Sequence, residues 1–161
     1  MNTAQALPHP SVHARFARDL SALGAETDAQ AACDALLVAH ASEPRRYHTF
    51  AHVEACLGWL DWSWSLAQRP HEIAIALFFH DAVYEPLATD NEAKSAAWAR
   101  DVLGRAGVAE EVLARVAAMI LATRTHEASD EDTALLLDID LAILGSATST
   151  FARFELSLIH I

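Results

Sequence analysis

The apolar residues of this chain recur at helical spacing, three and four positions apart, along nearly its whole length. Glycine or proline interrupts the pattern at Gly24, Pro44, Gly107 and Gly145, as is typical of helix ends. The pattern therefore predicts an all-α fold of about seven to eight helices. The expected helices are residues 11–23, 28–41, 49–67, 70–81, 89–105, 109–123, 133–144 and 148–161.

The densest apolar run, Ile73–Phe79, leads directly into the pair His80-Asp81. A run of this kind belongs in a core, where a carboxylate is costly unless a counter-charge or a metal ion accompanies it. The negative end of a helix dipole would disfavour an ionised Asp81 further. A bound divalent cation would relieve both costs. The alternative is a buried His80 bonded to a backbone carbonyl, with Asp81 capping the next turn.

Two more pairs of ionisable residues lie within predicted helices. His48 and His52 are four positions apart, which places them on one helical face, although such pairs also arise by chance. Asp138 and Asp140 interrupt an aliphatic stretch and lie about 200° apart around a helix. Only one of these aspartates can face a buried site, unless both lie on a solvated face.

Composition narrows the class of protein. The 161 residues are 53% hydrophobic, which fits one domain spanning residues 1–161. The formal net charge of −11 argues against a protein that coats nucleic acid, and it requires any phosphate site to supply its own cations. Two cysteines, Cys33 and Cys56, fit a reducing compartment, and we find no signal-peptide pattern or membrane span. We therefore expect a cytoplasmic protein.

The candidate residues follow one another in the order His52, His80-Asp81 and an aspartate within an apolar helix. This order resembles the HD-domain superfamily of metal-dependent phosphohydrolases, and more narrowly the small bacterial group described as predicted metal-dependent HD phosphohydrolases. The resemblance extends from about residue 12 to residue 156. The matching words are Tyr47-His48-Thr49-Phe50-Ala51-His52, Phe79-His80-Asp81-Ala82-Val83-Tyr84, Asp90-Asn91-Glu92 with Ser95-Ala96, Ala122-Thr123 followed by His126, and Leu137-Asp138-Ile139-Asp140-Leu141.

The resemblance implies a single HD-like helical domain with a divalent metal ion held by His52, His80, Asp81 and Asp140. Asp138 stays open as the alternative to Asp140. Two imidazoles and two carboxylates suit Mn, Fe, Co, Ni, Zn or Mg, so ligand type does not choose among these metals.

Three residues receive catalytic roles from the same resemblance. Asp81 belongs to both the metal site and the catalytic set. Glu92 would orient or deprotonate the water that the metal activates. His126 would bind a second metal or donate a proton to the leaving oxygen. The competing interpretations are a capping box of Thr89 with Glu92 and a surface histidine at position 126.

The resemblance also implies a small phosphorylated substrate. We expect His48, Lys94 and Arg124 to contact its phosphate, although Lys94 and Arg124 are also typical solvated side chains. The implied reaction is hydrolysis of a phosphate ester or nucleotide, of the phosphomonoesterase or phosphodiesterase type. The alternatives are a di-iron HD-type oxygenase and a metal-binding module without turnover.

The end of the chain departs from the family pattern. Residues 154–161 lack the basic and aromatic helical segment that similar proteins have there. We therefore expect a truncated or altered C-terminus, which would remove part of a pocket wall or of a homodimer contact. The metal motifs all precede this point.

Overall fold

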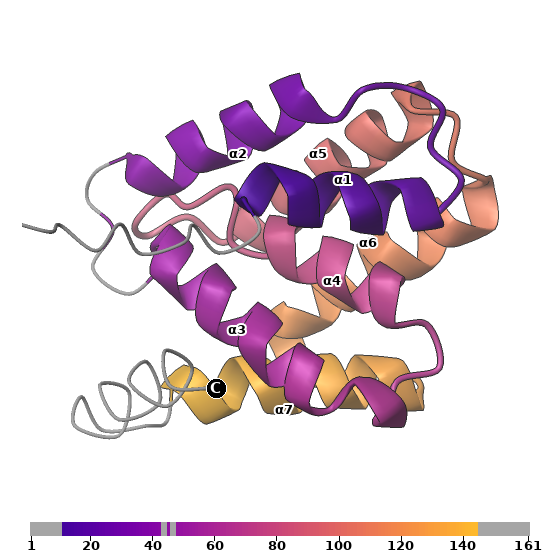
Figure 1. Ribbon diagram of the computed structural model, residues 1–161. Coiled ribbons are helices and arrows are strands. Elements are labelled where there is room, and N and C mark those ends of the chain that lie inside the picture. Colours follow the sequence, from indigo (N-terminus) through magenta and orange to yellow (C-terminus); the bar gives the residue numbers. More distant parts are fainter. Residues whose placement is uncertain (1–10, 43–44, 46–47, 145–161) are drawn as a thin grey trace, which may run out of the picture.

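The computed structural model describes residues 11–42, 45 and 48–144. These residues form seven α-helices and one short 3-10 helix, with no strand among them, and so confirm the predicted all-α bundle (Figure 1). The expected helix over 148–161 lies outside the described residues. The elements are α1 (Val12–Ala22), α2 (Gln30–Ala41), α3 (Phe50–Trp62), η1 (Trp64–Leu66), α4 (Pro70–Phe79), α5 (Asn91–Arg105), α6 (Glu110–Thr125) and α7 (Glu131–Leu144).

Helix α4 is the centre of the bundle. Its residues from Ile73 to Phe79 are all fully buried, as expected of a helix that is apolar on every side. It packs against α1, α3, α5, α6 and α7, which surround it in Figure 1. The ring of Phe78 meets the ring of Phe16 from α1 edge to face, with centroids 5.0 Å apart.

The packing of the remaining helices places the end of α4 next to α3 and α7. Helices α5 and α6 form a pair joined by a turn at Gly107, whose φ of +85° suits glycine. Helices α3 and α7 pack against each other and both contact α4. The start of α3, the end of α4 and the later part of α7 can therefore contribute to one site.

Two helices end earlier than the apolar pattern predicts. Helix α3 ends at Trp62 because the Ser63 hydroxyl donates to the carbonyl of Trp59 at 2.8 Å, and a 3-10 turn follows. Helix α4 ends at Phe79, so His80 is its C-cap and Asp81 lies in the turn beyond it. The pair therefore follows the helix rather than continuing it.

The capping box expected from Thr89 and Glu92 is wrong. Helix α5 begins at Asn91. Among the described residues, its N-cap, Asp90, makes no side-chain capping hydrogen bond. The Asn91 side chain instead makes two hydrogen bonds with the backbone of Glu85, each 3.1 Å long. The start of α5 therefore stabilises the loop that follows the His-Asp pair.

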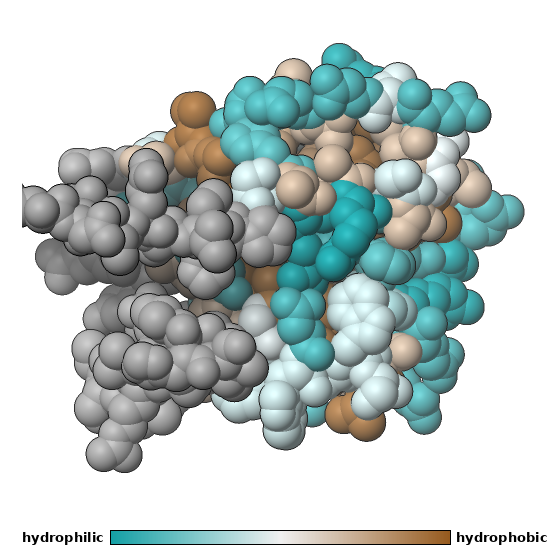
Figure 2. All heavy atoms as spheres, viewed as in Figure 1, coloured by the Kyte–Doolittle hydropathy of each residue, from teal (hydrophilic) through white to brown (hydrophobic). Residues whose placement is uncertain are grey.

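The described surface in Figure 2 is mostly polar, and its apolar patches are small and separated. The exposed large apolar side chains come from different elements, as is common on monomeric proteins. They are Val38, Trp62, Leu66, Leu87, Leu121 and Leu141. Among the described residues, no helix has both the length and the apolar content needed to span a membrane.

Candidate metal centre

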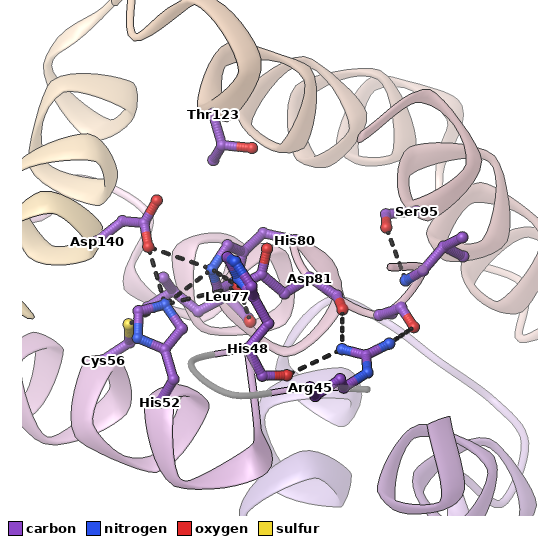
Figure 3. Close-up of polar contacts among 12 residues, drawn as sticks. Arg45, His48, His52, Cys56, Leu77, His80, Asp81, Ser95, Thr123 and Asp140 are labelled. Carbon is purple, nitrogen blue, oxygen red and sulfur yellow. Dashed lines mark hydrogen bonds and ion pairs between the residues drawn. The ribbon is translucent and has the colours of Figure 1, made fainter. Parts of the chain in front are cut away.

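Three helices bring together the four residues expected to bind a metal (Figure 3). His52 lies in the first turn of α3, and His80 caps α4 with Asp81 next to it. Asp140 lies on α7, in its second half. Three of the four are at most 4% exposed, whereas the Asp81 side chain is 19% exposed. Solvent therefore reaches this cluster from the side of Asp81.

The polar atoms of the cluster lie close to one another. His52 Nε2 is 2.9 Å from Asp140 Oδ1, 3.3 Å from His80 Nε2 and 3.7 Å from Asp81 Oδ2. His80 Nε2 is 3.3 Å from a carboxylate oxygen of Asp81 and 3.3 Å from one of Asp140. Two imidazole nitrogens and two carboxylates thus point toward a common centre.

One hydrogen bond determines which ring nitrogen of His80 carries the proton. Its Nδ1 lies 2.7 Å from the carbonyl oxygen of Leu77. Because a carbonyl can only accept, Nδ1 must carry the N–H. Nε2 of a neutral His80 is then a lone pair that faces two acceptors, Asp81 and Asp140. A proton from His52 Nε2 at 3.3 Å, a second proton on His80 or a cation between the groups can each satisfy this arrangement.

The pKa shifts of these residues also indicate that the cluster favours a positive charge. Burial by itself would lower the pKa of His80, but the charge of Asp81 and hydrogen bonds to Asp140 and Asp81 raise it well above its usual value. Burial opposes the ionisation of Asp140, yet its hydrogen bonds with His52 and His80 lower its pKa. The pKa of Asp81 is likewise well below its usual range, since the neighbouring histidines outweigh its burial. A bound cation would supply this positive charge directly.

The donor set fits a divalent metal ion. Ligand atoms of His52, His80 and Asp81 lie within 4.8 Å of one another, and so do those of His52, Cys56 and Asp140. Two ligands that bind one ion at about 2.1 Å are separated by roughly 3 to 3.5 Å, similar to the distances here. Metal-binding histidines commonly donate their other N–H to a backbone carbonyl, as His80 does.

Asp19 shows how this chain satisfies a buried carboxylate without a metal. Its side chain is fully buried and accepts from Arg15 at 2.9 Å, Arg18 at 3.1 Å and His71 at 2.8 Å. No arginine or lysine side chain of the described residues forms an ion pair with the carboxylate of Asp81 or Asp140. The two clusters therefore balance their charge in different ways.

A second layer of residues supports Asp81 and the turn that carries it. His48 Nδ1 donates to Asp81 Oδ2 at 2.7 Å, and this bond raises the pKa of His48. The His48 ring stacks on Tyr84 with centroids 4.6 Å apart. The Arg45 guanidinium donates to the backbone oxygens of His48, Asp81 and Ala82 at 2.6–2.9 Å, as Figure 3 shows. Arg45 therefore joins the segment before α3 to the turn after α4.

Replacing Arg45 by methionine is expected to weaken divalent metal binding about 10- to 100-fold, as measured by isothermal titration calorimetry. Methionine keeps much of the side-chain length but none of the donors that orient the turn carrying Asp81. Arg105→Met is the matched control, because Arg105 is exposed and, among the described residues, pairs with Asp101 of its own helix alone. Equal affinities in both variants would show that Arg45 does not position the site.

The structure places the two aspartates of α7 on different sides of the helix. Asp140 is 4% exposed and contacts His52, whereas Asp138 is exposed to solvent. This agrees with their angular separation of about 200°. Asp140, not Asp138, is therefore the one that the structure brings to the cluster.

Three other expected site residues, Glu92, Lys94 and Arg124, make no hydrogen bond or ion pair with the cluster among the described residues. Glu92 is partly buried in the first turn of α5, and no hydrogen bond or ion pair joins it to the four clustered residues described above. Lys94 is exposed and pairs with Glu85 at 3.5 Å and Asp90 at 3.4 Å. Arg124 is exposed near the end of α6. Their roles stay predictions.

His126 is exposed and is the C-cap of α6, with a left-handed backbone at φ 59° and ψ 31°. Asparagine tolerates this conformation well, whereas alanine does not. We expect His126→Asn to keep the melting temperature and the metal content of the protein, since no described contact links His126 to the cluster. Metal analysis and thermal melting check this. Loss of bound metal in His126→Asn would place His126 among the ligands.

Two residues of the site have no place in the sequence prediction. Cys56 Sγ lies 3.7 Å from His52 Nε2, and its position four residues after His52 is a signal that could have identified it. The sequence indicates Arg45 only weakly, because it is simply a cationic residue three positions before His48. Burial and the charges of Asp140 and Asp81 raise the pKa of the Cys56 thiol well above its usual value.

Comparisons with protein-family models, with curated proteins and with solved structures found no match to this chain.

Proposed function

We propose that this chain is an HD-type, metal-dependent phosphohydrolase that acts on a small phosphate ester or nucleotide. The observation that carries the proposal is the convergence of His52, His80 and Asp140 from three helices, with Asp81 at the solvent side. This set occurs in the order and chemistry that the HD resemblance predicts. It also lacks an arginine or lysine side chain that would otherwise balance its carboxylates among the described residues.

A divalent ion bound here would supply the acidity that ionises a water near neutral pH and the charge that neutralises a phosphoryl oxygen. The chain's own residues would hold and orient the ion and the substrate. His52, His80, Asp81 and Asp140 are the expected ligands. Among these four side chains, that of Asp81 is the most exposed, so we expect the substrate to approach from its side.

His48 is the best placed of the proposed phosphate-binding residues. Its side chain is 28% exposed and is oriented by its bond to Asp81 and by its stacking on Tyr84. Nδ1 is engaged with Asp81, which leaves Nε2 for a substrate oxygen. Arg124 is a second candidate cation. Lys94 is less suited, because Glu85 and Asp90 already neutralise it.

Glu92 remains the proposed residue for orienting the attacking water. Its position in α5 is not used for helix capping, so its carboxylate is available for another role. His126 remains the proposed proton donor. Both cysteines are free thiols, which supports a reducing and hence cytoplasmic location.

The proposed function is tested by loading the protein with Mn²⁺, Fe²⁺, Co²⁺, Ni²⁺, Zn²⁺ or Mg²⁺ and screening phosphomonoesters, phosphodiesters and nucleotides for phosphate release. We expect turnover with at least one metal and none with Asp140→Asn, while Asp138→Asn keeps it. Oxygen uptake by a form with two bound irons would replace the proposal with the oxygenase alternative. Stoichiometric metal binding without turnover of any of the phosphate compounds would favour the silent binding module.

A further inference from the structure

Cys56 is the one sulfur donor at the candidate metal centre among the described residues. It lies one helical turn after His52 on α3, on the inner side of the helix, and is fully buried. Figure 3 shows its sulfur beside the His52 ring, on the side of the cluster near Asp140. The second cysteine, Cys33, is buried in α2, outside both groups of potential metal ligands.

The donors around His52 form two overlapping groups. One contains His52, His80 and Asp81, and the other contains His52, Cys56 and Asp140. In the second group the three ligand atoms lie within 4.8 Å of one another, and Sγ is 3.7 Å from His52 Nε2. Zn²⁺ binds sulfur at about 2.3 Å and nitrogen at about 2.1 Å, so two such ligands lie roughly 3.6 Å apart in a tetrahedral site.

The chemistry of the second group differs from that of the first. Thiolate is a soft ligand that favours Zn²⁺, Co²⁺ and Fe²⁺, whereas Mn²⁺ and Mg²⁺ favour oxygen ligands. All three residues of the group are at most 4% exposed. The sequence resemblance assigns no ligand of this kind.

We propose that Cys56 is a metal ligand together with His52 and Asp140, and that it makes the centre selective for thiophilic divalent ions over Mn²⁺ and Mg²⁺. The inference rests on the proposed metal centre and adds a sulfur ligand to it. When the metal–sulfur bond forms, the thiol proton leaves to solvent, so no oxidant or reductant takes part. His80 and Asp81 belong to the other group of potential ligands, which shares His52.

Titration with Co²⁺ tests this directly, because a cobalt–thiolate bond has a near-ultraviolet charge-transfer band that nitrogen and oxygen ligands do not give. We expect the wild-type protein to show this band together with the visible bands of bound Co²⁺. Cys56→Ala should keep the visible bands and lose the near-ultraviolet band. Cys33→Ala is the matched control, since it removes the other buried thiol and should keep both sets of bands.

Affinities provide a second measurement. We expect Cys56→Ala to bind Zn²⁺ about 100-fold or more weakly than the wild type, while its affinity for Mn²⁺ changes less than about threefold. Cys56→Ser and circular dichroism establish that any loss is not a loss of folding. The X-ray absorption spectrum of the Zn²⁺-loaded wild type needs no variant and should show a sulfur neighbour at about 2.3 Å.

The outcomes separate this inference from the proposed metal centre. Bound Co²⁺ with visible bands but without a Cys56-dependent charge-transfer band would overturn the inference and leave the centre in place. A Zn²⁺ spectrum with nitrogen and oxygen neighbours only would do the same. Failure of the wild-type protein to bind any of these ions would overturn both.

Discussion

The Asp140→Asn variant is expected to bind divalent metal ions at least about 100-fold more weakly than the wild type. Replacing residues that merely support a metal ligand costs about 10- to 100-fold in affinity, so loss of a direct ligand falls at or beyond that range. Asparagine has nearly the same shape as aspartate but lacks the charge that balances the cation. Metal content after dialysis and isothermal titration calorimetry measure the effect.

The same variant should also lose the stabilisation that the metal provides. An ion at a hundred times its dissociation constant stabilises the folded state by about 2.7 kcal/mol. For a chain of this size that corresponds to a rise in melting temperature of roughly 5–10 °C. We expect this rise in the wild type and its near absence in Asp140→Asn.

Asp138→Asn is the control, because Asp138 lies on the same helix two positions away and is exposed. It should keep both the metal affinity and the rise in melting temperature. If Asp138→Asn loses the metal and Asp140→Asn keeps it, the assignment of the ligand is reversed. If both variants keep the metal affinity of the wild type, α7 does not supply a ligand.

Truncating Phe78 to alanine is expected to lower the free energy of unfolding by about 3–5 kcal/mol. Phe78 is fully buried in α4, with its ring 5.0 Å from that of Phe16 and 6.3 Å from that of Phe50. Removing it leaves a cavity between α1, α3 and α4 that the surrounding side chains can fill only in part. Urea denaturation followed by circular dichroism measures the change.

Val38→Ala provides the comparison, since Val38 is 73% exposed on α2. Substitutions at such positions usually change stability by no more than about 0.5 kcal/mol. A loss at Phe78 no larger than that at Val38 would contradict the central position of α4. The expected loss at Phe78 is a substantial fraction of the roughly 5–15 kcal/mol by which domains are usually stable.

The helical pattern predicted the bundle because local sequence carries that information. Apolar spacing and the breaks near Gly24 and Gly107 identified the described helices, and the all-apolar run of residues 73–79 identified the central one. Helix ends were less predictable. Ser63 bonds the backbone where α3 ends and Asn91 bonds the loop before α5, through contacts that depend on which backbone groups are close by.

The candidate site was predictable only in part, because its residues meet through the packing of distant helices. Angular separation showed that only one of Asp138 and Asp140 could face inward, but the choice depends on how α7 packs against α3 and α4. Two buried histidines, His40 and His80, each bond a backbone carbonyl within their own helical segment. They differ in their surroundings, and sequence alone does not reveal which of them meets a carboxylate.

Arg45 illustrates a contact that residue patterns cannot reveal. It donates to three backbone carbonyl oxygens, two of them 36 and 37 positions away along the chain. Every residue has such an oxygen, so no side-chain motif indicates the partner.

The burial of His40 lowers its pKa to about 4, which keeps this histidine neutral at neutral pH. That effect also arises only from the packed fold.

The candidate ligands are distant in the chain, with 28 positions between His52 and His80 and 88 between His52 and Asp140. Closing chain loops of this length costs conformational entropy, so we expect the complete donor set to assemble late in folding. Interactions that form after the folding transition state slow unfolding and leave the folding rate almost unchanged. A bound ion would therefore lengthen the lifetime of the native protein rather than guide its folding.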